Sequence, residues 1–203
     1  MLKFLLVGLV FAVSGFSGMT QAKSIVVLGD SISANYKFAE KYGWVTLLGD
    51  HLKNSHPDYT VYNASISGDT TAGGIARLPQ LLRRYQPDLV LIELGANDGL
   101  RGMSLKAMQK NLSTLVELAQ KSGAQVLLLS MRIPRNYGKR YIDMFYNSYQ
   151  QVGDQHKVPV VPFILEGVAL DKSKMQADGL HPNKKAQPII FQHVLPYIVP
   201  LLG

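Results

Sequence analysis

Continuous apolar runs alternate with helical patterns along this chain of 203 residues. Each run is rich in β-formers, and the segments between the runs carry apolar residues every three or four positions. The runs predict five strands, at residues 25–28, 59–63, 89–94, 125–130 and 158–161. Runs without polar alternation are typical of strands that are buried on both faces, as in parallel sheets. The pattern therefore predicts an α/β fold with a five-stranded parallel sheet.

The segments between the runs predict the covering helices. Helical spacing is found at residues 43–52, 75–82, 104–123, 140–156 and from 183 onward. In the third of these, Ser104 is a suitable N-cap and Gly123 a natural stop. Its apolar face is formed by Leu105, Met108, Leu112, Leu115, Val116 and Ala119. Right-handed crossovers between five parallel strands favour a flavodoxin-like three-layer αβα sandwich as the simplest topology. In such a fold the functional site lies at the carboxyl ends of the strands.

The first residues have the pattern of an export signal. Lys3 supplies the positive charge, residues 4–13 are almost wholly apolar, and Ala22 follows Thr20 at the spacing that a signal peptidase inspects. We therefore expect a signal peptide at residues 1–22 and one domain at residues 23–203, in the periplasm, with secretion as the second choice. An uncleaved N-terminal anchor is the alternative, although the apolar run is short for a membrane span.

Composition excludes several classes of site. The chain has no cysteine, which rules out disulfides, thiolate metal sites and a thiol nucleophile. The net charge of +7 favours contact with anionic surfaces such as lipid headgroups. The lysines and arginines form no long run, so we expect no nucleic-acid partner.

Ser31 is the candidate nucleophile, because the first strand ends abruptly in Gly29-Asp30-Ser31 and delivers one hydroxyl to the mouth of the sheet. A serine hydroxyl needs a base, and the base needs an acceptor that fixes its tautomer. His181 and Asp178, three residues apart on a loop turned by Gly179, can supply both.

Three groups can stabilise the negative charge of a tetrahedral intermediate. Gly68 follows the second strand and can offer its backbone N–H at close approach. Asn97 follows the third strand and can offer a side-chain amide, and the backbone N–H of Ser31 is the third donor. The three loops lie at the same end of adjacent strands, so these donors can converge.

Four blocks of sequence together resemble the SGNH (GDSL) hydrolases. They are Gly29-Asp30-Ser31, Gly68, Gly95-Ala96-Asn97-Asp98 and Asp178-Gly179-Leu180-His181. Longer matches, at residues 63–70, 93–95, 97–102 and 178–183, are similar to the bacterial periplasmic multifunctional thioesterase/lysophospholipase/arylesterase subgroup. The resemblance extends over essentially the whole of residues 23–203.

The resemblance implies the role of each residue. Ser31 is expected to be the nucleophile, His181 the base and Asp178 its orienting partner, with Ser31, Gly68 and Asn97 forming the oxyanion hole. Two positions depart from the subgroup, Ala96 and Asn35, where glycine is usual. Asparagine tolerates a left-handed backbone, so we expect tuning rather than loss. Asp30 and Asp98 are expected to brace loops by hydrogen bonds.

The chemistry expected is acyl transfer to water through an acyl-enzyme on Ser31, without a metal or other cofactor. We expect the acyl group to lie near the loops at residues 99–104 and 133–137. The apolar contacts expected there are Leu100, Met103, Ile133 and Pro134. The alternative is that these are ordinary connecting loops with a few exposed apolar residues.

We expect a serine esterase that hydrolyses single-chain acyl esters and thioesters, including lysophospholipids, aryl esters and acyl thioesters. Because acyl coenzyme A thioesters are cytoplasmic, an exported enzyme is expected to meet lysophospholipids or other single-chain esters as natural substrates. We expect a monomer. Two alternatives remain open at this stage. A carbohydrate O-acetyl esterase would need a polar groove, and a non-catalytic flavodoxin-like module would use Ser31 and Ser33 to cradle a phosphate.

Overall fold

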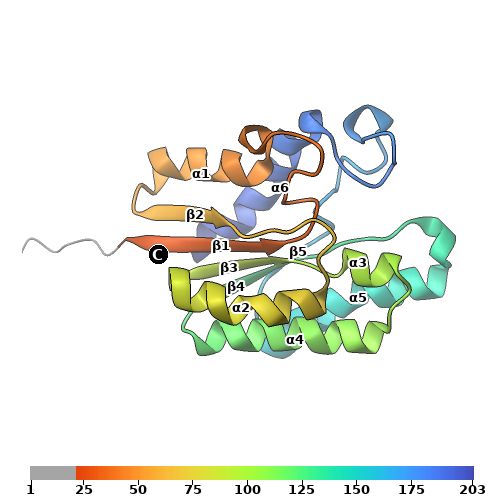
Figure 1. The fold of residues 1–203 in the computed structure, drawn as a ribbon, viewed down its shortest axis with the longest axis horizontal. Helices are drawn as coiled ribbons and strands as arrows, with labels where there is room; N and C mark the ends of the chain where they lie inside the picture. The colour runs from red at the N-terminus through yellow and green to blue at the C-terminus, as the bar shows by residue number, and fades with distance from the viewer. Residues whose placement is uncertain (1–21) are drawn as a thin grey trace, which may run out of the picture.

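The computed structural model describes residues 22–203, so the expected signal segment lies outside the described residues apart from Ala22. A five-stranded parallel sheet forms the centre of the fold (Figure 1). Its strands, in sequence order, are β1 (Lys23–Gly29), β2 (Tyr59–Asn63), β3 (Leu89–Glu93), β4 (Gln125–Leu129) and β5 (Val160–Val161). Their spatial order, β2-β1-β3-β4-β5, is the flavodoxin-like order, and it confirms the predicted topology.

Helices cover both faces of this sheet, which gives three layers. Helices α1 and α6 lie on one face, and α2, α4 and α5 on the other (Figure 1). The helices are α1 (Trp44–Ser55), α2 (Thr71–Tyr85), α3 (Ala96–Leu100), α4 (Leu105–Lys121), α5 (Lys139–His156) and α6 (Gln187–Ile198). Short 3-10 turns are η1 (Glu40–Tyr42), η2 (Arg135–Tyr137), η3 (Lys172–Lys174), η4 (Lys184–Ala186) and η5 (Val199–Leu201). Among residues 22–203, no helix combines the length and apolar character that a membrane crossing requires.

Burial along the strands follows their position in the sheet. Every residue of β3 is buried, and so is all of β1 except Lys23. The two-residue strand β5 lies at the sheet edge, directly after Pro159, a residue that cannot donate a hydrogen bond to a neighbouring strand. The central strands are thus a rigid base for the residues that follow them.

Helix α4 matches its sequence pattern closely. The Ser104 hydroxyl accepts a hydrogen bond from the Ala107 N–H, and Gly123 adopts φ +91° just beyond the helix. The buried residues are the six predicted for the apolar face, Leu105, Met108, Leu112, Leu115, Val116 and Ala119. Local sequence alone therefore specifies the orientation of this helix.

Two local features differ from, or refine, the sequence pattern. The segment after β3, expected as a loop, forms the short helix α3. Near the C-terminus, η4 is followed directly by α6, with Pro188 in the first turn of the helix. A proline in that position lacks an N–H that would have no partner anyway, so it restarts the helix without breaking it.

Candidate active site

The Ser31 side chain lies at the carboxyl end of β1, in the turn that follows Gly29 and Asp30. Its Oγ is 2.9 Å from Nε2 of His181. Nδ1 of the same ring is 2.9 Å from Oδ2 of Asp178. The three predicted residues thus form one hydrogen-bonded chain, although 150 positions separate the serine from the histidine.

The Asp178 carboxylate is fixed by its own loop. Its Oδ1 accepts hydrogen bonds from the backbone N–H groups of Leu180 and His181, each at 3.0 Å. Partial burial alone would raise the pKa of Asp178, but these hydrogen bonds and the contact with the imidazole outweigh it and lower the pKa to about 2. The carboxylate is therefore ionised at neutral pH and holds a proton on Nδ1, which leaves Nε2 free to accept one from Ser31.

Tyr36 packs against the base, a contact that the sequence patterns did not indicate. The centroids of the Tyr36 and His181 rings are 4.3 Å apart, with 36° between the ring planes. Gln176 joins the two segments, because its side-chain amide donates to the carbonyls of Tyr36 and Pro182. The loop that carries His181 is thereby attached to the turn that carries Ser31.

The predicted backbone donors are free to act. Within residues 22–203, neither the N–H of Ser31 nor that of Gly68 donates to an acceptor. Gly68 has φ +81°, a left-handed conformation that glycine adopts without cost. A carbonyl oxygen placed beside both groups could accept two hydrogen bonds.

Asn97 lies in the first turn of α3, where its amide group already donates two hydrogen bonds. Nδ2 is 3.0 Å from Oδ2 of Asp30 and 2.8 Å from the carbonyl oxygen of Asp69. The structure therefore brings Asn97 beside the nucleophile turn, with both amide hydrogens engaged. To stabilise an oxyanion, the amide must share or release one of these partners.

A buried carboxyl pair lies beneath Ser31. Asp30 is 1% exposed and Glu93, the last residue of β3, is fully buried. Glu93 Oε2 accepts hydrogen bonds from the Asp30 N–H and the Ser33 hydroxyl, at 3.2 and 2.8 Å. These two residues flank Ser31, so Glu93 fixes the turn on both sides.

Burial changes the ionisation of this pair. It raises the pKa of Asp30 to about 6 and, together with the nearby Asp30 carboxyl, raises the pKa of Glu93 well above its ordinary value. Glu93 was not among the residues predicted for the site, although a single charged residue in an otherwise apolar strand is a signal that indicates a buried polar role.

Arg77 connects the loops after β1 and β2. Its Nε is 2.6 Å from Oδ2 of Asp69, and its other nitrogens donate to the carbonyls of Gly29 and Ala64. The guanidinium therefore holds the nucleophile strand and the Gly68 loop together. No local pattern pointed to Arg77, because its partners are distant in sequence.

Expectations for the neighbouring residues are confirmed. Asp98 is buried and accepts hydrogen bonds from the N–H and hydroxyl of Thr71, which braces the start of α2. Asn35 adopts φ +59°, the left-handed conformation expected there. Ser33 is buried with its hydroxyl on Glu93, so it does not face a ligand as the binding-module alternative required.

The four expected acyl contacts differ in exposure. Met103 is 42% exposed, and Leu100 and Pro134 are half-buried. Ile133 is only 6% exposed and packs beneath Gly99 in the core, so it supports the loop instead of lining a surface. The two loops are joined, since the Tyr137 hydroxyl donates to the Leu100 carbonyl at 2.7 Å. Residues 22–203 contain no group of three or more side chains placed to hold a metal ion.

Residues 27–188 match the model of the GDSL-like lipase/acylhydrolase family. The chain belongs to this family. It is therefore a serine hydrolase, and the family resemblance drawn from the sequence is confirmed.

Relatives and a solved structure agree with this assignment. The chain is 51% identical over 181 residues to esterase TesA of Pseudomonas aeruginosa, covering 89% of this chain and 90% of that protein. It is 47% identical over 199 residues to an arylesterase of Vibrio mimicus, covering 98% of each. It is 41% identical over 182 residues to thioesterase 1/protease 1/lysophospholipase L1 of Escherichia coli K12, covering 90% of this chain and 86% of that protein. The crystal structure of TesA superimposes with a TM-score of 0.87 at 50% identity, covering 89% of this chain and all of that one.

Proposed function

We propose that this GDSL-like hydrolase cleaves single-chain acyl esters and thioesters, including lysophospholipids and aryl esters, through an acyl-enzyme on Ser31. The observation that carries the proposal is the unbroken hydrogen-bonded chain from Asp178 through His181 to Ser31, at 2.9 Å per step. A serine in this setting loses its proton to the imidazole as it attacks a carbonyl carbon.

In the acylation step, Ser31 Oγ forms a bond to the carbonyl carbon and its proton moves to Nε2 of His181. The resulting imidazolium is stabilised by the ionised Asp178. Nε2 then donates the proton to the leaving oxygen or sulfur as that bond breaks. Water repeats the sequence on the acyl-enzyme, with His181 again taking and returning one proton.

The negative charge on the carbonyl oxygen needs donors in place before the reaction. The free N–H groups of Ser31 and Gly68 meet this need directly. For Asn97 we propose that the hydrogen now bound to the Asp69 carbonyl turns toward the oxyanion, while the bond to Asp30 keeps the amide in position.

We propose that the acyl chain lies over the loop at residues 99–104, where Leu100 and Met103 offer apolar surface beside Pro134. The export pattern at residues 1–22 supports a periplasmic location, and the basic composition supports transient contact with anionic lipid. A monomer remains the proposed state.

The test is hydrolysis of a p-nitrophenyl acyl series from acetyl to palmitoyl by the wild type and by Ser31→Ala. We expect turnover of medium or long chains and a loss of about a thousandfold or more in the variant. Labelling of Ser31 by an alkyl phosphonate, located by peptide mass, would identify the acylated residue. Cleavage of the acetyl ester alone would favour a carbohydrate O-acetyl esterase, and equal rates in both proteins would reject the proposal.

A further inference from the structure

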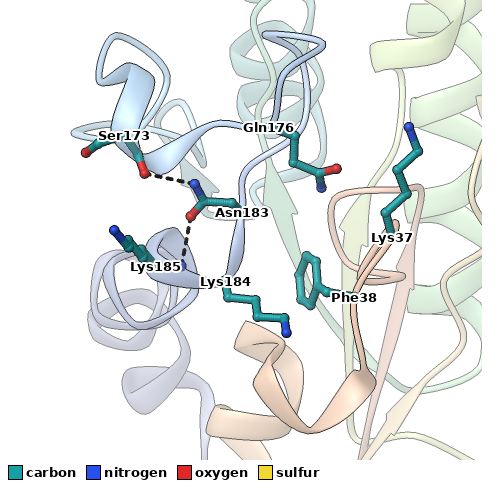
Figure 2. A pocket seen from close by; sticks show the side chains of 7 residues that line it. All are labelled: Lys37, Phe38, Ser173, Gln176, Asn183, Lys184 and Lys185. Atoms are coloured by element: carbon teal, nitrogen blue, oxygen red, sulfur yellow. Dashed lines mark hydrogen bonds between the residues drawn. The ribbon is translucent and has the colours of Figure 1, made fainter.

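A basic cavity of about 380 Å³ lies beside the loop that carries His181. It opens between the turn after β1 and the segment from η3 to η4, and we call it the lysine cavity (Figure 2). In this view Lys184 and Phe38 face each other, while Lys37 and Lys185 stand on opposite sides. Its lining residues are Lys37, Phe38, Ser173, Gln176, Asn183, Lys184 and Lys185. Three of the seven are lysines and none is acidic.

The frame of the lysine cavity is held by internal hydrogen bonds. The Asn183 amide donates to the carbonyls of Ser173 and Met175, and its oxygen accepts from the Lys185 N–H (Figure 2). The Ser173 hydroxyl donates to Asp171. Because these polar groups are satisfied within the protein, the groups left to bind a ligand are the lysine ammonium groups.

These ammonium groups have no acidic partner. Across the described part of the chain, no carboxylate lies within 4.0 Å of Lys37, Lys184 or Lys185. Lys184 Nζ lies 4.5 Å from the centroid of the Tyr42 ring, and Lys37 Nζ lies 4.9 Å from that of Tyr36. Cation–π contacts of this kind orient an ammonium without neutralising it. An anion that enters the lysine cavity therefore meets uncompensated positive charge.

The lysine cavity adjoins the catalytic base. Tyr36 contacts both Lys37 and the imidazole. Lys37 Nζ lies 4.9 Å from the centroid of the Tyr36 ring, and the centroid of the His181 ring lies 4.3 Å from the same point. Gln176, a lining residue, donates its backbone N–H to the His181 carbonyl at 2.8 Å. The lysine cavity therefore borders both segments that hold the catalytic base, the turn with Tyr36 and the loop from Gln176 to His181. In the proposed mechanism, Nε2 of His181 protonates the leaving group, so the leaving group meets the protein next to this loop.

We propose that the lysine cavity binds a phosphate group carried by the leaving group of the substrate. The proposal rests on the esterase function proposed above and names its substrate class as phosphate-bearing acyl esters or thioesters. Lysine presents a compact charge suited to phosphate without demanding a fixed geometry. The glycerol phosphate of a lysophospholipid and the phosphates of an acyl coenzyme A share this chemistry, and free phosphate is a third source.

Matched substrates separate the sources. Lauroyl glycerol phosphate is compared with monolauroyl glycerol, and lauroyl coenzyme A with the lauroyl thioester of N-acetylcysteamine, all below their micelle concentrations. Within each pair the acyl chain and the scissile bond are the same. The glycerol esters differ only in the phosphate, and the thioesters differ in the phosphate-bearing remainder of coenzyme A, which the analogue lacks. Inorganic phosphate is then added as a competitor.

The variant K37Q/K184Q/K185Q removes the three charges, and R83Q/K110Q/K121Q is its control. The control residues are exposed on α2 and α4, on the other face of the sheet from α1 and α6, and the same net charge is lost (Figure 1). We expect the first variant to raise KM about tenfold for the phosphate-bearing substrates, with single lysine variants contributing about two- to threefold each. Salt should weaken the wild-type preference, since these charges are exposed. kcat, and KM for the neutral substrates, should not change.

Each outcome decides the proposal. A larger KM only for the phosphate-bearing member of one pair identifies the headgroup or the coenzyme as the source. Unchanged KM values in the triple variant, or an equal effect of the control variant, overturn the proposal while the neutral esters still report an active esterase. Competition by inorganic phosphate without any difference within the pairs assigns the lysine cavity to free phosphate and overturns the substrate role. Equal turnover of the neutral esters by the wild type and by Ser31→Ala would instead reject the esterase function itself.

Discussion

The Asp30 carboxyl accepts a hydrogen bond from the Asn97 amide at 3.0 Å, and so joins the residue before the nucleophile to the proposed oxyanion donor. One side chain thereby sets the distance between the attacking oxygen and the group that stabilises the charge it creates. Since the Asp30 N–H is also held by Glu93, this distance depends on the buried centre of the sheet more than on exposed segments.

Asn97→Ala should lower kcat by about two to three decades, the usual loss for one oxyanion donor, with little change in KM. Asn111→Ala is the control, because Asn111 also donates a side-chain hydrogen bond, to Thr71, but is not part of the site. Steady-state kinetics and thermal melts of both variants make the test. A decrease below about threefold for Asn97→Ala would remove this residue from the oxyanion hole.

His181→Ala should leave the fold intact and abolish nearly all turnover, because no other base reaches Ser31 Oγ within the described residues. Asp178→Asn should lower kcat by about three to four decades. The asparagine can still accept from the Leu180 and His181 N–H groups, but its amide faces Nδ1 and favours the wrong tautomer. Comparable turnover in either variant and the wild type would contradict the assigned roles.

The pKa of Asp178, lowered to about 2 from an ordinary value of 3.8, also predicts a pH dependence. A carboxyl group with a depressed pKa contributes stability above its unfolded pKa and loses it as the pH falls through the folded value. The wild type should therefore lose part of its free energy of unfolding between about pH 4 and pH 2 through this group. Chemical denaturation of Asp178→Asn over that range should lack this part of the slope.

Gly68→Ala should cost about 1–2 kcal/mol of stability, because alanine is strained at φ +81°. Space is not the problem, since an added Cβ would lie 3.8 Å from its nearest neighbour, Arg101 Nη2. Any relaxation of the backbone moves the N–H, so kcat should fall about ten- to a hundredfold. Gly123→Ala, at φ +91° with no neighbour within 4 Å, should cost similar stability and leave kcat unchanged. Equal kcat in the two variants would show that Gly68 is only structural.

Glu93→Gln should retain most of the activity, because the amide oxygen can accept the same hydrogen bonds from the Asp30 N–H and the Ser33 hydroxyl, and burial already disfavours the charged form of Glu93 by raising its pKa. Glu93→Ala removes the acceptor of the Asp30 N–H and the Ser33 hydroxyl, so its kcat should fall at least tenfold.

The raised pKa of Glu93 also predicts a pH dependence of stability. A group whose folded pKa is raised favours the folded state below its unfolded pKa and loses that contribution as the pH rises. Stability of the wild type should therefore decline above about pH 4.5, and Glu93→Gln should reduce that decline. Inactive Glu93→Gln with an intact fold would mean that a charge is needed.

Local patterns in the sequence were sufficient to predict most of the strands and helices of the fold. Apolar runs located all five strands of the sheet. Turn chemistry and an N-cap at Ser104 located α4, and helical spacing gave its buried face. Strand order then followed from the handedness of crossovers, so the loops carrying Ser31, Gly68 and Asn97 had to share one end of the sheet.

Other features depend on partners far away in sequence. The position of Ile133 in the core, the contact of Tyr36 with His181 and the three bonds of Arg77 have no local signature. The pairing of Glu93 with Asp30 spans 63 positions and that of Asn97 with Asp30 spans 67. Such contacts require the sheet to be assembled before the groups meet.

The sequence by itself determined the fold class, because periodicity and turn preferences act over a few neighbouring positions. Through the resemblance of its ordered blocks it also determined the family and the candidate catalytic residues. Only the tertiary structure decided which polar groups are free to act. It left the N–H groups of Ser31 and Gly68 without acceptors, engaged both hydrogens of Asn97, and placed three lysines without acidic partners around the cavity next to the His181 loop. The physical reason is that hydrogen bonding and burial depend on distances between chain segments, and those distances exist only after the layers have packed.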